Sequence, residues 1–160
     1  MARTPGTGHS NRATGKESFA VQIDEWVRES KERLEAVARM SIQDTVNDAQ
    51  TAAKQGGKMP VDTGFLRASG ASSLTGMPYG PDKRLSNVPG SYPSPAEYHT
   101  DPKVSVDLAN LKLGDTFYFG WTAEYARVRE FYDGFLGSAM QNWQQVVSRR
   151  AEELRKRSGK

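Results

Sequence analysis

The sequence has no cysteine and only two histidines among its 160 residues. Without cysteine, disulfides, thiolate catalysis and cysteine-built zinc sites are excluded. His9 and His99 have no second histidine or carboxylate at helical ligand spacing, and the pair His99 and Asp101 is more typical of solvated side chains than of a metal site. We therefore expect no metal, no cofactor and no Ser/His/Asp catalysis, and we do not expect an enzyme.

Long apolar runs are also lacking. No stretch approaches the roughly 20 residues that a membrane-spanning helix needs, and the N-terminus has no apolar region of the signal-peptide kind. We expect a soluble protein that is made in a cytoplasm and has no membrane partner. Hydrophobic residues make up only 36% of the chain. Globular domains typically contain about 45–50% apolar residues when glycine is counted as well. Such a chain would have a thin core, so we expect long tails, an oligomer or both.

Positive charge is only slightly in excess, with 22 basic against 19 acidic residues and a net charge of +3. Its position is more informative, because residues 1–16 carry basic residues and no carboxylate, and a second basic cluster lies near the C-terminus. Basic ends suit a protein that lies close to a polyanion, although they are also a common solubilising feature. The candidates for sequence-independent contact with DNA phosphates are Arg149, Arg150, Arg155, Lys156 and Arg157.

The first 16 residues have the composition of a flexible basic arm. Thr14 and Glu17 then have the S/T-x-x-E spacing of a capping box, which predicts the start of a helix. Apolar residues recur at spacings of three and four as far as Gly56-Gly57, which predicts one long amphipathic helix. We expect a single domain over residues 17–157 and a short tail at 158–160. The apolar face consists of Phe19, Ile23, Trp26, Val27, Leu34, Val37, Ala38, Ile42, Val46, Ala49 and Ala53.

After this helix the sequence predicts a corner and a long loop. Pro60 forces extended backbone before it, and Asp62 or Thr63 can cap a helical turn over residues 65–68. A short strand, "ASSL", is expected next. Residues 76–103 contain most of the chain's eight prolines, and a loop of this length is usually functional or disordered. Three tyrosines make it a possible contact surface, namely Tyr79, Tyr92 and Tyr98.

The last third predicts strands followed by helices. "VSVD" and "LKLGDTFYFGW" alternate between apolar and polar residues, which favours strands, with a turn at Gly114-Asp115. "TAEYARVREF" has helical spacing, and Ser138 with Gln141 forms a second capping box that opens a final helix. We therefore predict an α+β fold: a small antiparallel sheet flanked by the long N-terminal helix and a C-terminal helix, with a long Pro/Gly/Tyr-rich loop.

Paired carboxylates are the remaining route to acid–base chemistry. Asp44 and Asp48 lie one helical turn apart, a spacing at which two carboxyl groups can cooperate. Nothing apolar flanks them in a way that would raise a pKa, so we interpret the pair as part of a solvated face. A hydrolase that uses Asp62 and Thr63 is the one enzymatic alternative.

In order and spacing, four segments resemble one family: the long N-terminal helix, "PVDTGFLR", a strand followed by "YARVRE", and "SAMQNWQQVVSRRAEEL". This family comprises the small morphogenesis proteins of long-tailed bacteriophages and prophages, described as minor tail components or as tail-completion proteins of the head–tail joining region. The resemblance covers residues 19–154. The family's usual Glu-Tyr-Gly is replaced by Glu130-Phe131-Tyr132, with glycine delayed to Gly134. The signature falls on Pro60, Val61, Asp62, Thr63, Gly64, Leu66, Arg67, Tyr125, Ala126 and Glu130.

The resemblance implies a non-enzymatic structural protein of the virion, assembled in the cytoplasm of the bacterial host. It would form a ring, a hexamer by analogy, in the neck between the head connector and the tail tube. The implied partners are further copies of the chain, the neck connector or stopper, the tail terminator or tube proteins, and non-specifically the packaged double-stranded DNA. The implied interaction candidates are Asp62, Thr63, Gly64, Leu66, Arg67, Tyr125 and Glu130.

Two other functions stay open at this point: a tail terminator that caps the tube, and a DNA-binding accessory protein. The role of Arg67 is open as well. It either pairs within the chain, with Glu130 as the candidate partner, or it reaches the next subunit.

Overall fold

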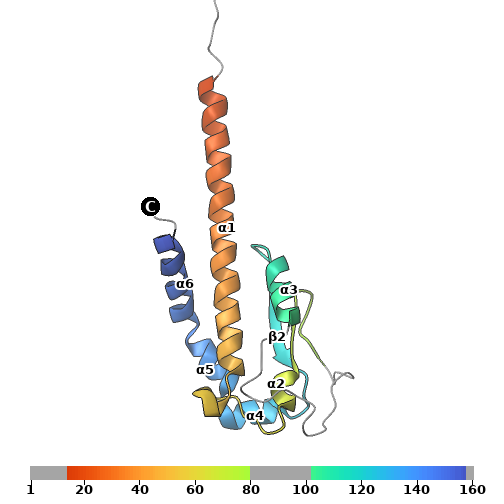
Figure 1. Cartoon of the computed structure of the whole chain (residues 1–160). Helices are drawn as coiled ribbons and strands as arrows, with labels where there is room; N and C mark the ends of the chain where they lie inside the picture. The colour runs from red at the N-terminus through yellow and green to blue at the C-terminus, as the bar shows by residue number, and fades with distance from the viewer. Residues whose placement is uncertain (1–13, 80–101, 158–160) are drawn as a thin grey trace, which may run out of the picture. The chain divides into compact units, whose positions relative to one another are not determined.

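The computed structural model describes residues 14–79 and 102–157, and the chain divides into two compact units, Met1–Arg33 and Leu34–Lys160. Helix α1 (Thr14–Gln50) begins in the first unit and ends in the second. The fold is α+β, as the sequence predicts. The other elements, drawn in Figure 1, are η1 (Ala53–Gln55), α2 (Phe65–Ala68), β1 (Gly70–Ser73), α3 (Pro102–Asn110), β2 (Tyr118–Trp121), α4 (Ala126–Asp133), α5 (Phe135–Gln141) and α6 (Trp143–Arg157).

Several predictions concern residues outside these ranges. The tail at 158–160, most of the Pro/Gly/Tyr-rich loop, His9, His99 and Asp101 all lie there, as does the predicted basic arm except for its last three residues. Those three residues form the start of α1, so the helix begins at the predicted capping box. None of the helices in the described part of the chain has the length and apolarity needed to cross a membrane.

Helix α1 ends at Gln50, earlier than the predicted stop at Gly56-Gly57. The chain instead reverses here: Ala52 is extended and forms a parallel bridge with Met59. The amide of Met59 donates to the carbonyl of Thr51 at 3.0 Å, and the amide of Ala53 donates to the carbonyl of Met59 at 3.0 Å. The apolar spacing alone does not reveal where the helix ends. Residues 49–53 continue the helical spacing of apolar side chains, although the backbone of residues 51–53 already forms hydrogen bonds with Met59.

Two of the three predicted strands are confirmed, and one is wrong. β1 and β2 pair antiparallel, with Gly70 opposite Trp121 and Ser73 opposite Tyr118. The segment "VSVD" (104–107), predicted as a strand, lies inside helix α3. Its alternation is only four residues long, whereas the buried positions Val104, Leu108 and Leu111 follow the wider helical spacing.

The predicted final helix is divided in two. α5 ends at Gln141, and α6 begins at Trp143. The predicted capping box is wrong, because Ser138 lies inside α5, where its hydroxyl donates to the carbonyl of Phe135 at 3.3 Å. α5 begins earlier, directly after Gly134, which has a left-handed backbone with φ of 63°. A side-chain hydroxyl inside a helix can bond to the preceding turn, and this bond competes with a capping role.

The second unit has two buried apolar clusters. One contains Met59, Leu66 and Phe135, and Trp121 packs its ring edge-to-face against Phe135 with centroids 4.8 Å apart. The other joins Val46 of α1 to the buried face of α3, with Phe119 packed against it. Phe119 and Trp121 are neighbours on one face of β2, with centroids 5.1 Å apart. The strand that was the strongest sequence signal therefore connects the two clusters.

Candidate functional site

The two sequence motifs of the resemblance meet at one cleft of about 360 Å³. The corner that follows α1 forms one side of it, and the start of α4 forms the other. We call it the motif cleft. These two segments are separated by about 60 residues in the sequence. They come together only when the chain folds. The lining residues are Pro60, Asp62, Thr63, Gly64, Phe65, Leu66, Tyr125 and Arg129.

A left-handed glycine and a threonine build the corner of the motif cleft. Gly64 has φ of 84°, a backbone region that residues with a Cβ rarely occupy. The hydroxyl of Thr63 accepts a hydrogen bond from the amide of Phe65 at 3.3 Å. The prediction that Asp62 or Thr63 caps α2 is wrong, because the N-cap is Gly64 and has no side-chain capping hydrogen bond. Thr63 instead stabilises the turn before the helix. The side chain of Asp62 is exposed at the mouth, while Leu66 is anchored in the first apolar cluster.

Arg67 and Glu130, two further residues of the sequence motifs, are not among the residues that line the cleft. Arg67 is only 2% exposed, which favours a role inside the chain over contact with a neighbouring subunit. The carboxylate of Glu130 accepts hydrogen bonds from the amides of Leu136 at 2.8 Å and Gly137 at 2.9 Å. It therefore satisfies free amides at the start of α5, a role that the sequence analysis missed. The suggested pairing of Arg67 with Glu130 stays a prediction.

Gly134 ends α4 after Glu130. The amide of Gly134 donates to the carbonyl of Glu130 at 2.8 Å, and its left-handed backbone leads into α5. α4 therefore continues beyond Glu130 as far as Asp133. Two of the residues beyond Glu130 are Phe131 and Tyr132, which are 84% and 74% exposed.

An exposed apolar surface adjoins the motif cleft. Tyr125 and Tyr132 lie on one face of α4 at helical spacing with Val128 between them, and Phe131 flanks this face. The rings of Phe131 and Tyr132 are edge-to-face with centroids 5.3 Å apart. Tyr125 links this surface to the cleft, because its ring centroid lies 6.1 Å from that of Phe65. We call Tyr125, Val128, Phe131 and Tyr132 the α4 surface.

Sequence analysis identified Tyr125 but missed the rest of the α4 surface. The signal was present in the spacing of Tyr125, Val128 and Tyr132, which mark one apolar helical face. It could not be recognised as exposed, because an apolar face on a short helix normally predicts burial. Large exposed apolar patches on soluble proteins generally mark sites of contact with another molecule.

Two of the polar groups of the motif cleft are engaged within the fold. The hydroxyl of Thr63 is engaged by a backbone amide, and Nη2 of Arg129 lies 2.8 Å from a carboxylate oxygen of Asp133. Within residues 14–79 and 102–157, no three histidine, aspartate or glutamate side chains come together as a metal site would require. The cleft is lined by apolar side chains such as Phe65 and Leu66 together with polar ones such as Asp62 and Arg129.

The basic cluster near the C-terminus is partly used inside the fold. α6 lies beside the second half of α1 (Figure 1), and Asp44 joins the two helices. One carboxylate oxygen of Asp44 accepts from Nε of Arg150 at 2.6 Å, and the other accepts from Nη2 of Arg150 at 2.6 Å. Arg149 adds a third contact at 3.1 Å, and Nη1 of Arg150 donates to Glu153 at 2.8 Å.

This geometry corrects the interpretation of Asp44 as a solvated carboxylate. The hydrogen bond from Arg150 lowers the pKa of Asp44 and outweighs partial burial, which acts in the opposite direction, and Arg149 adds to the lowering. The same contact raises the pKa of Arg150. Asp48, one turn further along α1, is exposed as predicted.

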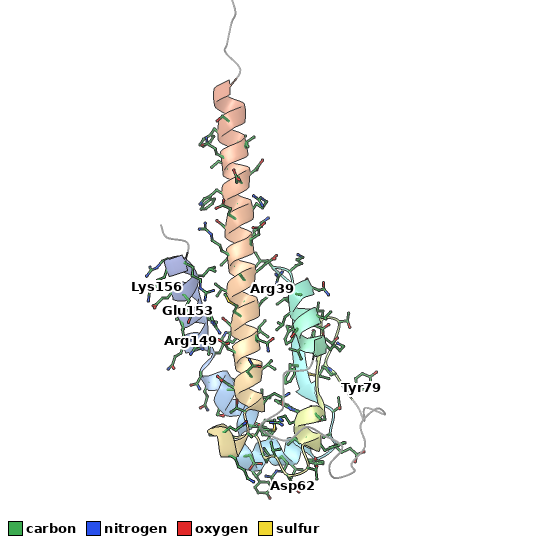
Figure 2. All side chains as sticks on the ribbon, viewed as in Figure 1. Arg39, Asp62, Tyr79, Arg149, Glu153 and Lys156 are labelled. Carbon is green, nitrogen blue, oxygen red and sulfur yellow. The ribbon has the colours of Figure 1, made fainter. Side chains whose placement is uncertain are left out.

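Of the five candidate DNA contacts, Arg149 and Arg150 are thus engaged by Asp44. Arg155, Lys156 and Arg157 are exposed in the last turn of α6. Figure 2 shows Arg149, Glu153 and Lys156 along α6, whereas Asp62 lies at the end of the second unit that carries α2 and α4. The motif cleft and the basic end of α6 are therefore separate surfaces.

Replacing Asp44 tests the junction between α1 and α6. We expect Asp44→Asn to lower the free energy of unfolding at pH 7 by about 1.5–3 kcal/mol, because charge-assisted hydrogen bonds to Arg150 are lost. Since the pKa of Asp44 is lowered from 3.8 in the folded protein, its contribution is present above that pH and disappears as the pH falls further. The difference between variant and wild type in urea unfolding should therefore vanish in acid.

Asp48→Asn is the matched control for this experiment, since it makes the same chemical change one helical turn away at an exposed position. It should alter the free energy of unfolding by no more than about 0.5 kcal/mol. Equal stability of Asp44→Asn and wild type at pH 7 would show that the junction contributes nothing.

Comparisons of the chain with protein-family models, with curated proteins and with solved structures find no match.

Proposed function

We propose that this protein is a structural subunit of the neck of a long-tailed bacteriophage, located in the virion, where a homo-oligomeric ring joins head to tail. The observation that carries the proposal is the α4 surface beside the motif cleft. Exposed Phe131 and Tyr132 offer aromatic anchors, and the adjoining cleft offers a concave surface lined by polar and apolar side chains. Buried aromatic anchors contribute most to the affinity of protein interfaces. In this proposal the combined surface contacts an adjacent neck protein, on the connector side or the tube side.

The composition supports the same function. Only 36% of the residues are hydrophobic, yet several large apolar side chains of the described chain are exposed. A chain that exposes such side chains in isolation gains stability when neighbouring subunits cover them. A tail terminator would also need neighbouring subunits to cover its exposed apolar side chains. Co-purification distinguishes a terminator from a head–tail joining protein, because a terminator binds tube protein when no connector is present.

A DNA-binding accessory protein is the second candidate, favoured by one observation. Arg155, Lys156 and Arg157 form an exposed run of cations at the end of α6. They also complement the partial negative charge at a helix C-terminus, which is a purely structural reason for their presence. A ring around packaged DNA can use the same cations for contacts with phosphates, so they are compatible with both candidates.

Sizing the purified protein with and without duplex DNA tests these candidates. We expect a ring that forms at physiological salt without DNA and has the same mass when duplex DNA is added. A monomer that binds duplex DNA would favour the accessory protein instead. In that case replacing Arg155, Lys156 and Arg157 by glutamine should reduce the slope of log affinity against log salt by up to about 2.7, because each lost phosphate contact contributes about 0.9.

A further inference from the structure

The first unit carries an exposed apolar stripe on α1. Phe19, Ile23 and Trp26 follow one another at spacings of four and three residues, so they lie on one helical face. Phe19 and Trp26 are 65% and 66% exposed. We call these three residues the α1 stripe. Because both aromatic side chains remain largely in contact with solvent in the single chain, burying them offers a large gain in free energy.

The charged residues of this helix segment are satisfied by one another. Arg28 lies 3.6 Å from Glu25 and 3.2 Å from Glu32, and Arg33 lies 3.2 Å from Glu29. Arg28, Glu25 and Glu32 occupy the face opposite the α1 stripe, whereas Arg33, seven residues after Trp26, lies beyond the end of the stripe on its own face. The ion pairs keep a charged face toward solvent and leave the apolar face as the surface that remains to be covered.

The second unit carries an apolar groove of about 530 Å³. Side chains from α1, β2, α5 and α6 line it, and the lining is mainly aromatic and aliphatic. Met140 at its edge is exposed, and methionine adapts its shape to a binding partner. We call this surface the apolar groove. The residues that line it include Ile42, Val46, Phe117, Phe119, Met140 and Trp143.

Charge indicates which surface the stripe fits. Residues 18–33 carry four carboxylates against three cations, whereas α6, which begins at Trp143 in the groove, carries five cations against two carboxylates. A stripe packed against a second stripe would bring two acidic segments together. A stripe placed in the groove of another copy would bring an acidic segment beside a basic helix, which is the favourable combination.

We propose that the α1 stripe of one copy occupies the apolar groove of the next copy. The contact is head-to-tail, because it joins two different surfaces of the same chain, and repeated rotation by this contact closes a ring. Each copy then fills one groove and has its own groove filled. This inference rests on the proposed function and identifies the two surfaces that hold the ring together.

Two charge substitutions test the contact without disturbing the core of either unit. Trp26→Glu alters the stripe, and Met140→Glu alters the groove, and both residues are more than half exposed. Each should weaken self-association by roughly 30-fold or more, the effect of losing an interface anchor. Val21→Glu is the matched control for the stripe, since Val21 is 63% exposed on the opposite face of α1, and Val106→Glu on α3 is the control for the groove. Both controls should keep the wild-type mass.

Mixing the two variants distinguishes head-to-tail contact from other arrangements. Trp26→Glu retains an intact groove and Met140→Glu retains an intact stripe, so each alone should be monomeric, while an equal mixture should form a heterodimer. Met140→Glu that dimerises alone would show that stripes pair with stripes and would overturn the inference. If the wild-type protein forms a ring and each of the two variants forms the same ring, the inference about the stripe and the groove would be overturned. The proposal that the protein forms a ring would then still hold. Wild-type protein that stays monomeric at about 100 µM would contradict both proposals.

Discussion

Arg67→Ala is expected to lower the free energy of unfolding by about 3 kcal/mol or more, the largest stability effect that we predict for a single side chain. The side chain is 2% exposed and belongs to α2, the helix that follows the corner of the motif cleft. Its truncation leaves a void and removes hydrogen-bond donors from an interior that cannot replace them with water. Urea unfolding followed by circular dichroism measures the change.

Arg127→Ala is the control for this substitution, because Arg127 is exposed on α4 and the same truncation there should alter stability by no more than about 0.5 kcal/mol. If Arg67 instead contacts a neighbouring subunit, the result is reversed: the monomer keeps its stability and the mass of the assembly falls. That outcome would show that burial within the chain does not define its role.

Replacing both Phe131 and Tyr132 by serine is expected to separate ring formation from joining. The ring should keep its mass, because the α1 stripe and the apolar groove are untouched. Affinity for the adjacent neck protein should fall by roughly 30-fold or more, since two exposed aromatic anchors are lost. Co-purification with that protein measures the loss.

The matched control replaces Val106 and Leu113 by serine, which removes two exposed apolar side chains elsewhere on the second unit. This control should retain binding. Equal binding by the Phe131/Tyr132 variant and by the control would show that the α4 surface is not the contact.

The parts of the fold that follow local rules could be predicted from the sequence. The start of α1 at Thr14 matches the position of the predicted capping box, and β2 matches the alternation around Phe119 and Trp121. The corner at Thr63 and Gly64 was also predictable, because glycine tolerates a positive φ and a hydroxyl can accept from a nearby amide. Each of these features depends only on residues that are close together in the sequence.

Features that depend on distant residues could not be predicted. Asp44 was interpreted as solvated because nothing near it in the sequence showed that Arg150, 106 residues away, would bind both of its oxygens. Val104 belongs to a helix because its partners at Leu108 and Leu111 pack against α1 and the sheet. The cleft itself exists only because Phe135 and Met59 bury the segments on either side of it in one cluster.

The proposed division of surfaces assigns a separate task to each part of the chain. The stripe and the groove would hold copies together, the α4 surface and the motif cleft would bind the adjacent neck protein, and the basic end of α6 would lie near phosphates. Only the first two tasks need apolar side chains at the surface, and the stripe and the α4 surface supply exposed aromatic side chains for them.

The central claim is tested most directly with a phage mutant that does not make this protein. Purified protein is added to the lysate of cells infected with that mutant. The account predicts filled heads and separate tails in that lysate, and a rise in infectious particles when wild-type protein is added but not when the Phe131/Tyr132 variant is added. Infectious particles formed in normal number without the protein, or an added wild-type ring that leaves heads and tails apart, would contradict a role in joining them.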